Sequence, residues 1–244
     1  MSKPESIKAL LNNSPQQRPG KDRIRYLDDP ITAKQLNEAN LCHEKSCECF
    51  VAANDYLAHG LQREGDRALN DAIFYSRRAV SHFASFSEAY TTIASACLLK
   101  GDFNRAIEVC KEIQHIKPDA LDFHFYWARA LFNLAVKAVE KGDPESAAIL
   151  LTEAMSEAQT EIFVGGVSSQ LVAVLTQIFA LKVRLLSQSV ITAGLDSSEA
   201  ELLREALDCQ IICAEKLHQL QLTRDNARIL KDLREIRLRL QPLV

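Results

Sequence analysis

Three glycine–aspartate pairs, each placed between two amphipathic stretches, constrain the fold of this chain more than any other feature. They are Gly65-Asp66, Gly101-Asp102 and Gly142-Asp143, which recur at intervals of 36 and 41 residues. Glycine readily adopts the left-handed conformation that ends a helix, and aspartate accepts hydrogen bonds from the first N–H groups of the next helix. Each pair therefore predicts a sharp turn between two helices, and their recurrence predicts an array of helical hairpins.

The rest of the chain is also typical of helices. Only 8 glycines and 7 prolines occur in 244 residues, and residues of high helix propensity dominate. Asp29-Pro30 predicts the start of the first helix, with a carboxylate cap followed by proline at the first helical position. The predicted fold is all-α, an α-solenoid of antiparallel helix pairs. Its predicted helices span residues 30–63, 68–84, 87–100, 103–117, 120–141, 144–160, 167–192, 197–220 and 223–240.

Three regions are expected. Residues 1–29 are polar and rich in helix breakers, which predicts a flexible tail, and residues 30–164 form the repeat array. Residues 165–244 form C-terminal helices that continue or cap the array. The last helix carries Ile229, Leu233, Ile236 and Leu240 at spacings of 4, 3 and 4. That pattern suits a capping helix with a polar outer face, and the seam of a homodimer is the alternative.

Composition excludes several classes of protein. A net charge of −3 provides no basic field for nucleic acid. The most apolar stretch, residues 171–186, is interrupted by Gln177, Lys182 and Arg184, so no membrane span is expected. The first residues lack the apolar core of a secretion signal, and the seven cysteines are then best interpreted as reduced thiols. We expect a cytoplasmic protein, without excluding the nucleus.

Motifs that carry chemistry are missing from the sequence. Cys42, His43, Cys47 and Cys49 are the one cluster that resembles a metal site, but they share one predicted helix and Cys47 points away from the others. We interpret these cysteines as core residues and expect no metal or other cofactor. Neither a phosphate-binding loop nor a nucleophile elbow occurs. The chain is therefore not expected to be an enzyme or to bind a small-molecule substrate.

One repeat can be followed residue by residue from Ser87 to Ala120, a span of 34 residues. Its apolar and small positions are Tyr90, Ile93, Ala94 and Cys97 on the first helix, then Ala106, Cys110 and Ile113 on the second, before Pro118. This pattern resembles the tetratricopeptide repeat. Two small residues, Ala94 and Ala106, predict a close crossing of the two helices.

Neighbouring units follow the same scheme more loosely. Upstream, Leu57-Ala58 precedes Gly65-Asp66, and downstream Leu134-Ala135 precedes Gly142-Asp143. The resemblance covers about residues 42–160. Within it, the aromatic run Phe123–Trp127 is interpreted as core packing at a repeat junction, with an exposed partner-binding patch as the alternative.

The resemblance implies that the first helix of each pair lines the concave side of a curved stack, where partner proteins bind. The implied partner-binding residues are Asp55, His59 and Gln62 in the first unit, Thr91, Thr92 and Ser95 in the second, and Arg129, Phe132 and Val136 in the third. The lysines and asparagines with which some members of the family grip a C-terminal carboxylate are not at these places. No such carboxylate clamp is therefore expected.

The expected function is a protein–protein interaction scaffold or adaptor that binds a segment or helix of a partner protein in this groove. An assembly or secretion chaperone for one client is the alternative. A nucleic-acid-binding helical repeat is the second alternative. It would need a basic groove, whereas the predicted groove contains one basic residue, Arg129, and one acidic residue, Asp55. These functions follow from likeness of fold and not from a specific site.

Overall fold

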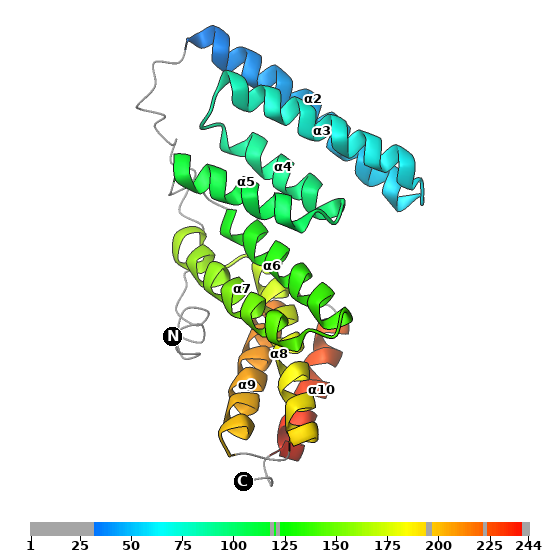
Figure 1. The fold of residues 1–244 in the computed structure, drawn as a ribbon, viewed down its shortest axis with the longest axis vertical. Coiled ribbons are helices and arrows are strands. Elements are labelled where there is room, and N and C mark those ends of the chain that lie inside the picture. The colour runs from blue at the N-terminus through cyan, green and yellow to red at the C-terminus, as the bar shows by residue number, and fades with distance from the viewer. Residues whose placement is uncertain (1–31, 118–119, 121–122, 194–196, 222–223, 241–244) are drawn as a thin grey trace. The chain divides into compact units, whose positions relative to one another are not determined.

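The fold is known from a computed structural model that describes residues 32–117, 120, 123–193, 197–221 and 224–240. Over these residues the chain forms helices and no strand, which confirms the all-α prediction (Figure 1). The predicted tail 1–29 and the predicted helix start Asp29-Pro30 lie outside the described residues. The helices are α2 (Ala33–Ala58), α3 (Gln62–His82), α4 (Ser87–Leu99), α5 (Phe103–Ile116), α6 (Phe123–Glu140), α7 (Pro144–Gly165), α8 (Ser169–Ala193), α9 (Ser197–Leu220) and α10 (Arg224–Leu240).

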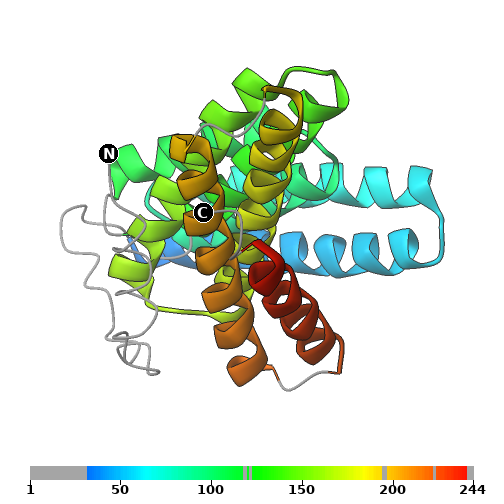
Figure 2. The ribbon, with the colours of Figure 1, turned by 90° about the horizontal axis from the view of Figure 1, so that it is seen from below.

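Two compact units make up the described chain, and the division falls after Ala130, inside α6. The first unit contains α2, α3, α4, α5 and the beginning of α6. The second contains the rest of α6 and the helices α7, α8, α9 and α10. In the first unit, the long hairpin of α2 and α3 lies beside α4, and its tip reaches past the end of α4 (Figures 1 and 2).

Three hairpin turns share one geometry. Gly60, Gly101 and Gly142 have φ values of 74°, 73° and 77°, in the left-handed region. In each turn, the residue after the glycine donates its N–H to the carbonyl five residues before it. These bonds are Leu61 to Tyr56 at 2.8 Å, Asp102 to Cys97 at 2.9 Å, and Asp143 to Ala138 at 2.9 Å. This is the Schellman ending of a helix, repeated at two equal intervals of 41 residues.

The first turn lies at Gly60 and not at Gly65, which corrects the sequence-based prediction. Gly65 lies buried inside α3, so α2 ends five residues earlier than the predicted boundary at residue 63. A Cβ atom built at Gly65 would stand 2.7 Å from the side chain of Leu57. Gly65 thus serves close packing of two helices, whereas Gly60 serves the turn. The start of α2 is capped by Thr32, which forms a capping box with Gln35.

Small residues stand at each crossing of a helix pair. The first helices carry Ala53, Ala94 and Ala135, and the second helices carry Gly65, Ala106 and Ala147. The five alanines are 0% exposed and Gly65 is buried. Both series repeat every 41 residues, in step with the turns. Burial of Ala94 and Ala106 agrees with the close crossing that the sequence predicts, because small side chains let helix backbones approach.

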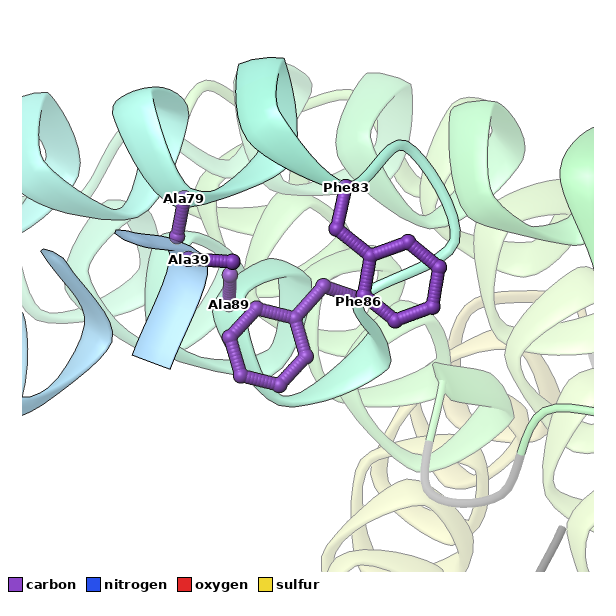
Figure 3. Packing of buried hydrophobic residues seen from close by; sticks show 5 residues of the cluster. All are labelled: Ala39, Ala79, Phe83, Phe86 and Ala89. Carbon is purple, nitrogen blue, oxygen red and sulfur yellow. The ribbon is translucent and has the colours of Figure 1, made fainter. Parts of the chain in front are cut away.

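Aromatic packing joins α2, α3 and α4 at the end of the first hairpin. Phe83 and Phe86 flank the α3–α4 connection, and their rings stack with centroids 5.9 Å apart. Ala39, Ala79 and Ala89 lie together on one side of the rings and belong to the same cluster (Figure 3). Burying two phenylalanine side chains stabilises the fold by about 1.5–3 kcal/mol each, which fixes where α4 begins against α2.

Polar contacts also join α3, α4 and α5. Arg77 donates to Glu112 at 2.8 Å, and the hydroxyl of Tyr90 donates to the same carboxylate at 3.2 Å. Burial, with the charge of Glu112, holds the pKa of Tyr90 well above its usual 10, so the phenol stays protonated and remains a donor. One carboxylate therefore ties together three helices.

The second unit ends in a helical bundle. Helix α8 buries Leu171, Leu175 and Ile178, and α10 packs Leu230 and Leu233 against α9. Arg234 of α10 pairs with Glu215 of α9 at 2.6 Å, and Arg237 pairs with Asp208 at 2.5 Å. In the predicted apolar stripe of α10, Leu233 is buried while Ile229 and Ile236 are 46% and 45% exposed. Only part of that stripe thus packs within this chain.

Among the helices that the structure describes, one has the length and composition of a membrane span. The stretch Ser169–Gln188 of α8 has a mean hydropathy of 1.4, and 33% of it is buried within the protein. The core helix of a soluble protein meets the same criterion. The expectation that the chain has no membrane span therefore remains a prediction.

Candidate protein-binding face

The equal spacing of the turns fixes which residues of the first helices correspond. Counting 41 residues back from Thr91, Thr92 and Ser95 of α4 leads to Phe50, Val51 and Asn54 of α2. Counting 41 residues forward leads to Phe132, Asn133 and Val136 of α6. Phe132 and Val136 were among the predicted groove residues, whereas Phe50, Val51 and Asn54 were not. The missed signal was the spacing itself, which becomes equal only when Gly60 is taken as the first turn.

The predicted residues of the first unit have a different register. Asp55 corresponds to Ala96, which is 0% exposed and packs with Ala53 of α2, and His59 is the C-cap of α2. Gln62 opens α3 and donates to Asp66 at 3.2 Å, so it belongs to a second helix. Asp55, His59 and Gln62 are all exposed, but they do not share the register of Thr91, Thr92 and Ser95.

Within the first unit, α2 packs against α4, and one side of this pair forms what we call the first-helix face: Val51 and Asn54 of α2 with Glu88, Thr92 and Ser95 of α4. Val51 is 60% exposed, which makes it the main apolar contact that the face offers. Thr91 and Thr92 donate their hydroxyls to the carbonyl of Glu88, at 2.8 and 3.1 Å. Both hydroxyl protons are thus used within α4, and the two threonines can offer a partner only hydroxyl oxygens as acceptors and methyl groups.

Negative charge exceeds positive charge on the two helices that form this face, although Glu38 contacts His82 of α3 at 3.2 Å and Asp55 lies outside the register of the face. Together α2 and α4 carry five carboxylates, of Glu38, Glu44, Glu48, Asp55 and Glu88, against the two lysines Lys34 and Lys45. Lys34 pairs with Glu38 at 3.9 Å, and the ammonium of Lys45 lies 5.8 Å from the ring centre of Tyr75 on α3. The lysines are therefore directed to other contacts, and Glu44 and Glu48 remain exposed.

The ring of His43 lies where α2 contacts the beginning of α4. Burial lowers the pKa of His43 below its usual 6.5, while Glu88 of α4 and Glu44 of α2 act in the opposite direction. The ring packs edge-on against Phe86, with centroids 5.2 Å apart. The ring contact thus joins α2 to the beginning of α4, and the lowered pKa keeps His43 neutral.

The cysteines of α2 are less buried than predicted. Cys47 is exposed, and Cys42 and Cys49 are half-buried, so the interpretation as core residues is wrong for Cys47. Cys47 and His43 approach to 3.5 Å between Sγ and Nε2. Burial and the charge of Glu44 raise the pKa of Cys47, which keeps it a thiol and not a reactive thiolate. In the described part of the chain, no three His, Cys, Asp or Glu side chains gather as a metal site would require.

The aromatic run at the start of α6 is buried. Phe123, Phe125 and Trp127 are 2%, 7% and 7% exposed, and the ammonium of Lys111 lies 5.3 Å from the ring centre of Trp127. This confirms core packing for the run and leaves little of it accessible as a binding patch. Arg129, the remaining predicted groove residue, follows on the same helix and is exposed.

A shallow groove of about 470 Å³ lies between α9 and α10 in the second unit. Leu230 and Leu238 provide its apolar lining, with His218, Lys231 and Glu235 at its sides. It lies outside the repeated hairpins and contains none of the predicted groove residues.

Comparison with known proteins gives one family match. The model of the family described as anaphase-promoting complex, cyclosome, subunit 3, which is of the tetratricopeptide type, matches residues 66–142. The match runs from α3 to the α6–α7 turn and covers less than half of the chain. No curated protein sequence matches this chain.

Several crystal structures are similar over most of this chain at low identity. They are the TPR protein TTC0263 of Thermus thermophilus (20% identity, 78% of this chain and 99% of that chain, TM-score 0.43), a putative protein binding protein of Bacteroides ovatus (12%, 80% and 99%, 0.40), and the APC/C hetero-tetramer Cut9-Hcn1 (13%, 84% and 50%, 0.24). These TM-scores are low, so the assignment rests on the repeat and the family match.

The family match includes two of the three turns and one complete small-residue crossing, that of Ala94 and Ala106. These are the features from which the sequence pattern predicted the repeat. The chain is a tetratricopeptide-like helical repeat protein.

Proposed function

We propose that this chain is a scaffold or adaptor that binds a segment of a partner protein on the first-helix face. The observation that carries the proposal is Val51, an aliphatic residue that is 60% exposed at the register position of Thr92. Arrays of helix pairs bind partners on the surface lined by their first helices. An exposed apolar side chain surrounded by polar groups is the usual composition of a binding surface.

The charge of this face favours a protein partner over nucleic acid. The carboxylates on α2 and α4 outnumber the lysines by five to two, and this excess of negative charge would repel a phosphate backbone. Hydroxyl, amide and carboxylate groups beside Val51 suit the backbone and side chains of a peptide. A cytoplasmic location is part of this proposal.

A paired substitution tests the proposal. Val51→Arg places a bulky cation on the first-helix face, and Phe74→Arg places the same group on α3, where Phe74 is 57% exposed. Both variants change one exposed apolar residue to arginine, so their net charges are equal. The full-length tagged proteins are used to recover partners from cells of the source organism.

A partner that is recovered with the wild type and with Phe74→Arg, but lost with Val51→Arg, supports the proposal. Equal recovery by both variants refutes binding at this face. Circular dichroism melting curves of the two variants must match the wild type, because loss of folding would remove any partner.

A further inference from the structure

The acidic residues of the first-helix face indicate the charge of the partner segment. Glu44 directly follows His43 on α2, and Glu88 lies two residues after Phe86, whose ring contacts that of His43 with centroids 5.2 Å apart. Both carboxylates belong to exposed residues. Two acidic residues from different helices therefore flank the ring contact that joins α2 to the beginning of α4, the helix pair that presents the apolar contact at Val51.

Positive charge within α2 does not neutralise this pair. Lys34 contacts Glu38 on its own helix, and Lys45 lies over Tyr75 on the α3 side. Glu48 adds a further exposed carboxylate one turn from Glu44 on the same helix. The negative potential thus extends along α2 from Glu44 towards Val51.

Helix packing fixes the backbone positions of the two glutamates. Phe86 lies directly before α4 and contacts His43 edge-on, while Ala39 and Ala89 pack in the same cluster. The beginning of α4 is therefore fixed against α2, and with it the backbone at Glu44 and Glu88. A partner meets two helices that are already in place, so binding does not have to order their backbones.

We propose that the partner segment is basic and apolar, with an aliphatic or aromatic side chain against Val51 and a lysine or arginine between Glu44 and Glu88. This inference rests on the proposed function and specifies the chemistry of its partner. Opposite charge around an apolar centre raises specificity and the rate of association. An acidic segment would meet repulsion at the same place.

Selection of peptides tests the inference without a known partner. A displayed library of random peptides, each of about 16 residues, is selected on the full-length wild type, on Val51→Arg and on Phe74→Arg. Peptides that bind the wild type and Phe74→Arg but not Val51→Arg depend on the first-helix face. The inference expects these peptides to be enriched in lysine and arginine beside apolar residues.

A second measurement isolates the two carboxylates. The double variant Glu44→Gln, Glu88→Gln removes both charges while keeping side-chain size, and Glu201→Gln, Glu205→Gln on α9 is the matched control, since both of its residues are exposed. The first variant should weaken binding of the selected peptides by about threefold to tenfold, the effect of losing two exposed ion pairs. The control should change the affinity by less than about twofold.

The outcomes separate the two proposals. If face-dependent peptides are neutral or acidic, or bind the Glu44→Gln, Glu88→Gln variant as tightly as the wild type, the basic partner is refuted while binding at the face stands. If no selected peptide distinguishes Val51→Arg from Phe74→Arg, the face is not the binding site and the proposed function fails with it.

Discussion

The hydroxyl oxygens of Ser46 and Ser76 lie 2.6 Å apart in the interior of the α2–α3 hairpin, where both residues are 0% exposed. Ser46 also donates to the carbonyl of Ala72 at 2.8 Å. Because a hydroxyl has one proton, Ser76 must then donate to Ser46. Two small polar side chains thus satisfy each other where larger ones would separate the helices.

Replacing Ser46 with alanine should destabilise the protein by about 1–2 kcal/mol, because the buried hydroxyl of Ser76 loses its partner. The double variant Ser46→Ala, Ser76→Ala should cost less than the sum of the two single changes, since no hydroxyl is then left unpaired. Free energies of unfolding from urea titrations measure both effects. Strict additivity would show that the two hydroxyls do not interact.

Replacing Leu61 with aspartate should stabilise the protein by about 0.5–2 kcal/mol. Leu61 holds the N-cap position of α3, with φ and ψ of −83° and 69°, close to the −88° and 69° of Asp102. Asp102 and Asp143 accept hydrogen bonds from Arg105 and Ser146, whereas Leu61 forms no side-chain cap. Thermal melting checks the gain, and Asp102→Leu should show the reverse shift. A lower melting temperature for Leu61→Asp would contradict the equivalence of the turns.

Replacing Gly65 with alanine should destabilise the protein, although alanine is the better helix former. A Cβ atom there would stand 2.7 Å from Leu57, so the side chain of Leu57 or the helices must move. Overpacking of this kind costs about 1–3 kcal/mol. A second change, Leu57→Ala, provides space and should reduce the additional cost of Gly65→Ala in urea unfolding. An increase in stability from Gly65→Ala alone would show that α2 and α3 are not in close contact.

Stability should fall as the pH drops below 6.5, in part through His43. Burial lowers its pKa in the folded protein, so the unfolded chain takes up the proton first and unfolding becomes more favourable. The contribution of His43 is fully present above pH 6.5 and is lost as the pH falls through the lowered value. Urea midpoints at about pH 7.5 and about pH 5.5 measure the loss, which should be smaller in His43→Gln. If the wild type and His43→Gln lose equal stability between the two pH values, protonation of His43 does not contribute to the loss.

Local signals were sufficient to predict most helices. The predicted ends of α4, α5, α9 and α10 agree with the structure to within one residue, because glycine, aspartate and proline mark several of these ends chemically. The first hairpin was misplaced because Gly60 is followed by a leucine. Gly65, followed by Asp66, imitated the turn signal while serving a close helix contact.

The prediction of the candidate face on α2 depended on the position of the first turn. A shift of five residues along α2 changes the helix face, so Asp55 and His59 were predicted where Phe50 and Asn54 now stand. Thr91, Thr92 and Ser95 kept their register because Gly101-Asp102 was interpreted correctly. Interactions between distant segments, such as that of Glu88 with His43, have no local signal in the sequence.

Photo-crosslinking tests the central claim most directly. A photoreactive phenylalanine analogue is placed at Val51 on the first-helix face or at Phe74 on α3, two side chains of nearly equal exposure, 60% and 57%. Each full-length protein is illuminated in cells, and its covalent products are identified by mass spectrometry. Binding at the first-helix face predicts a discrete protein adduct from position 51 and none of that mass from position 74. The same adduct from both positions, or an adduct from position 74 alone, would contradict it.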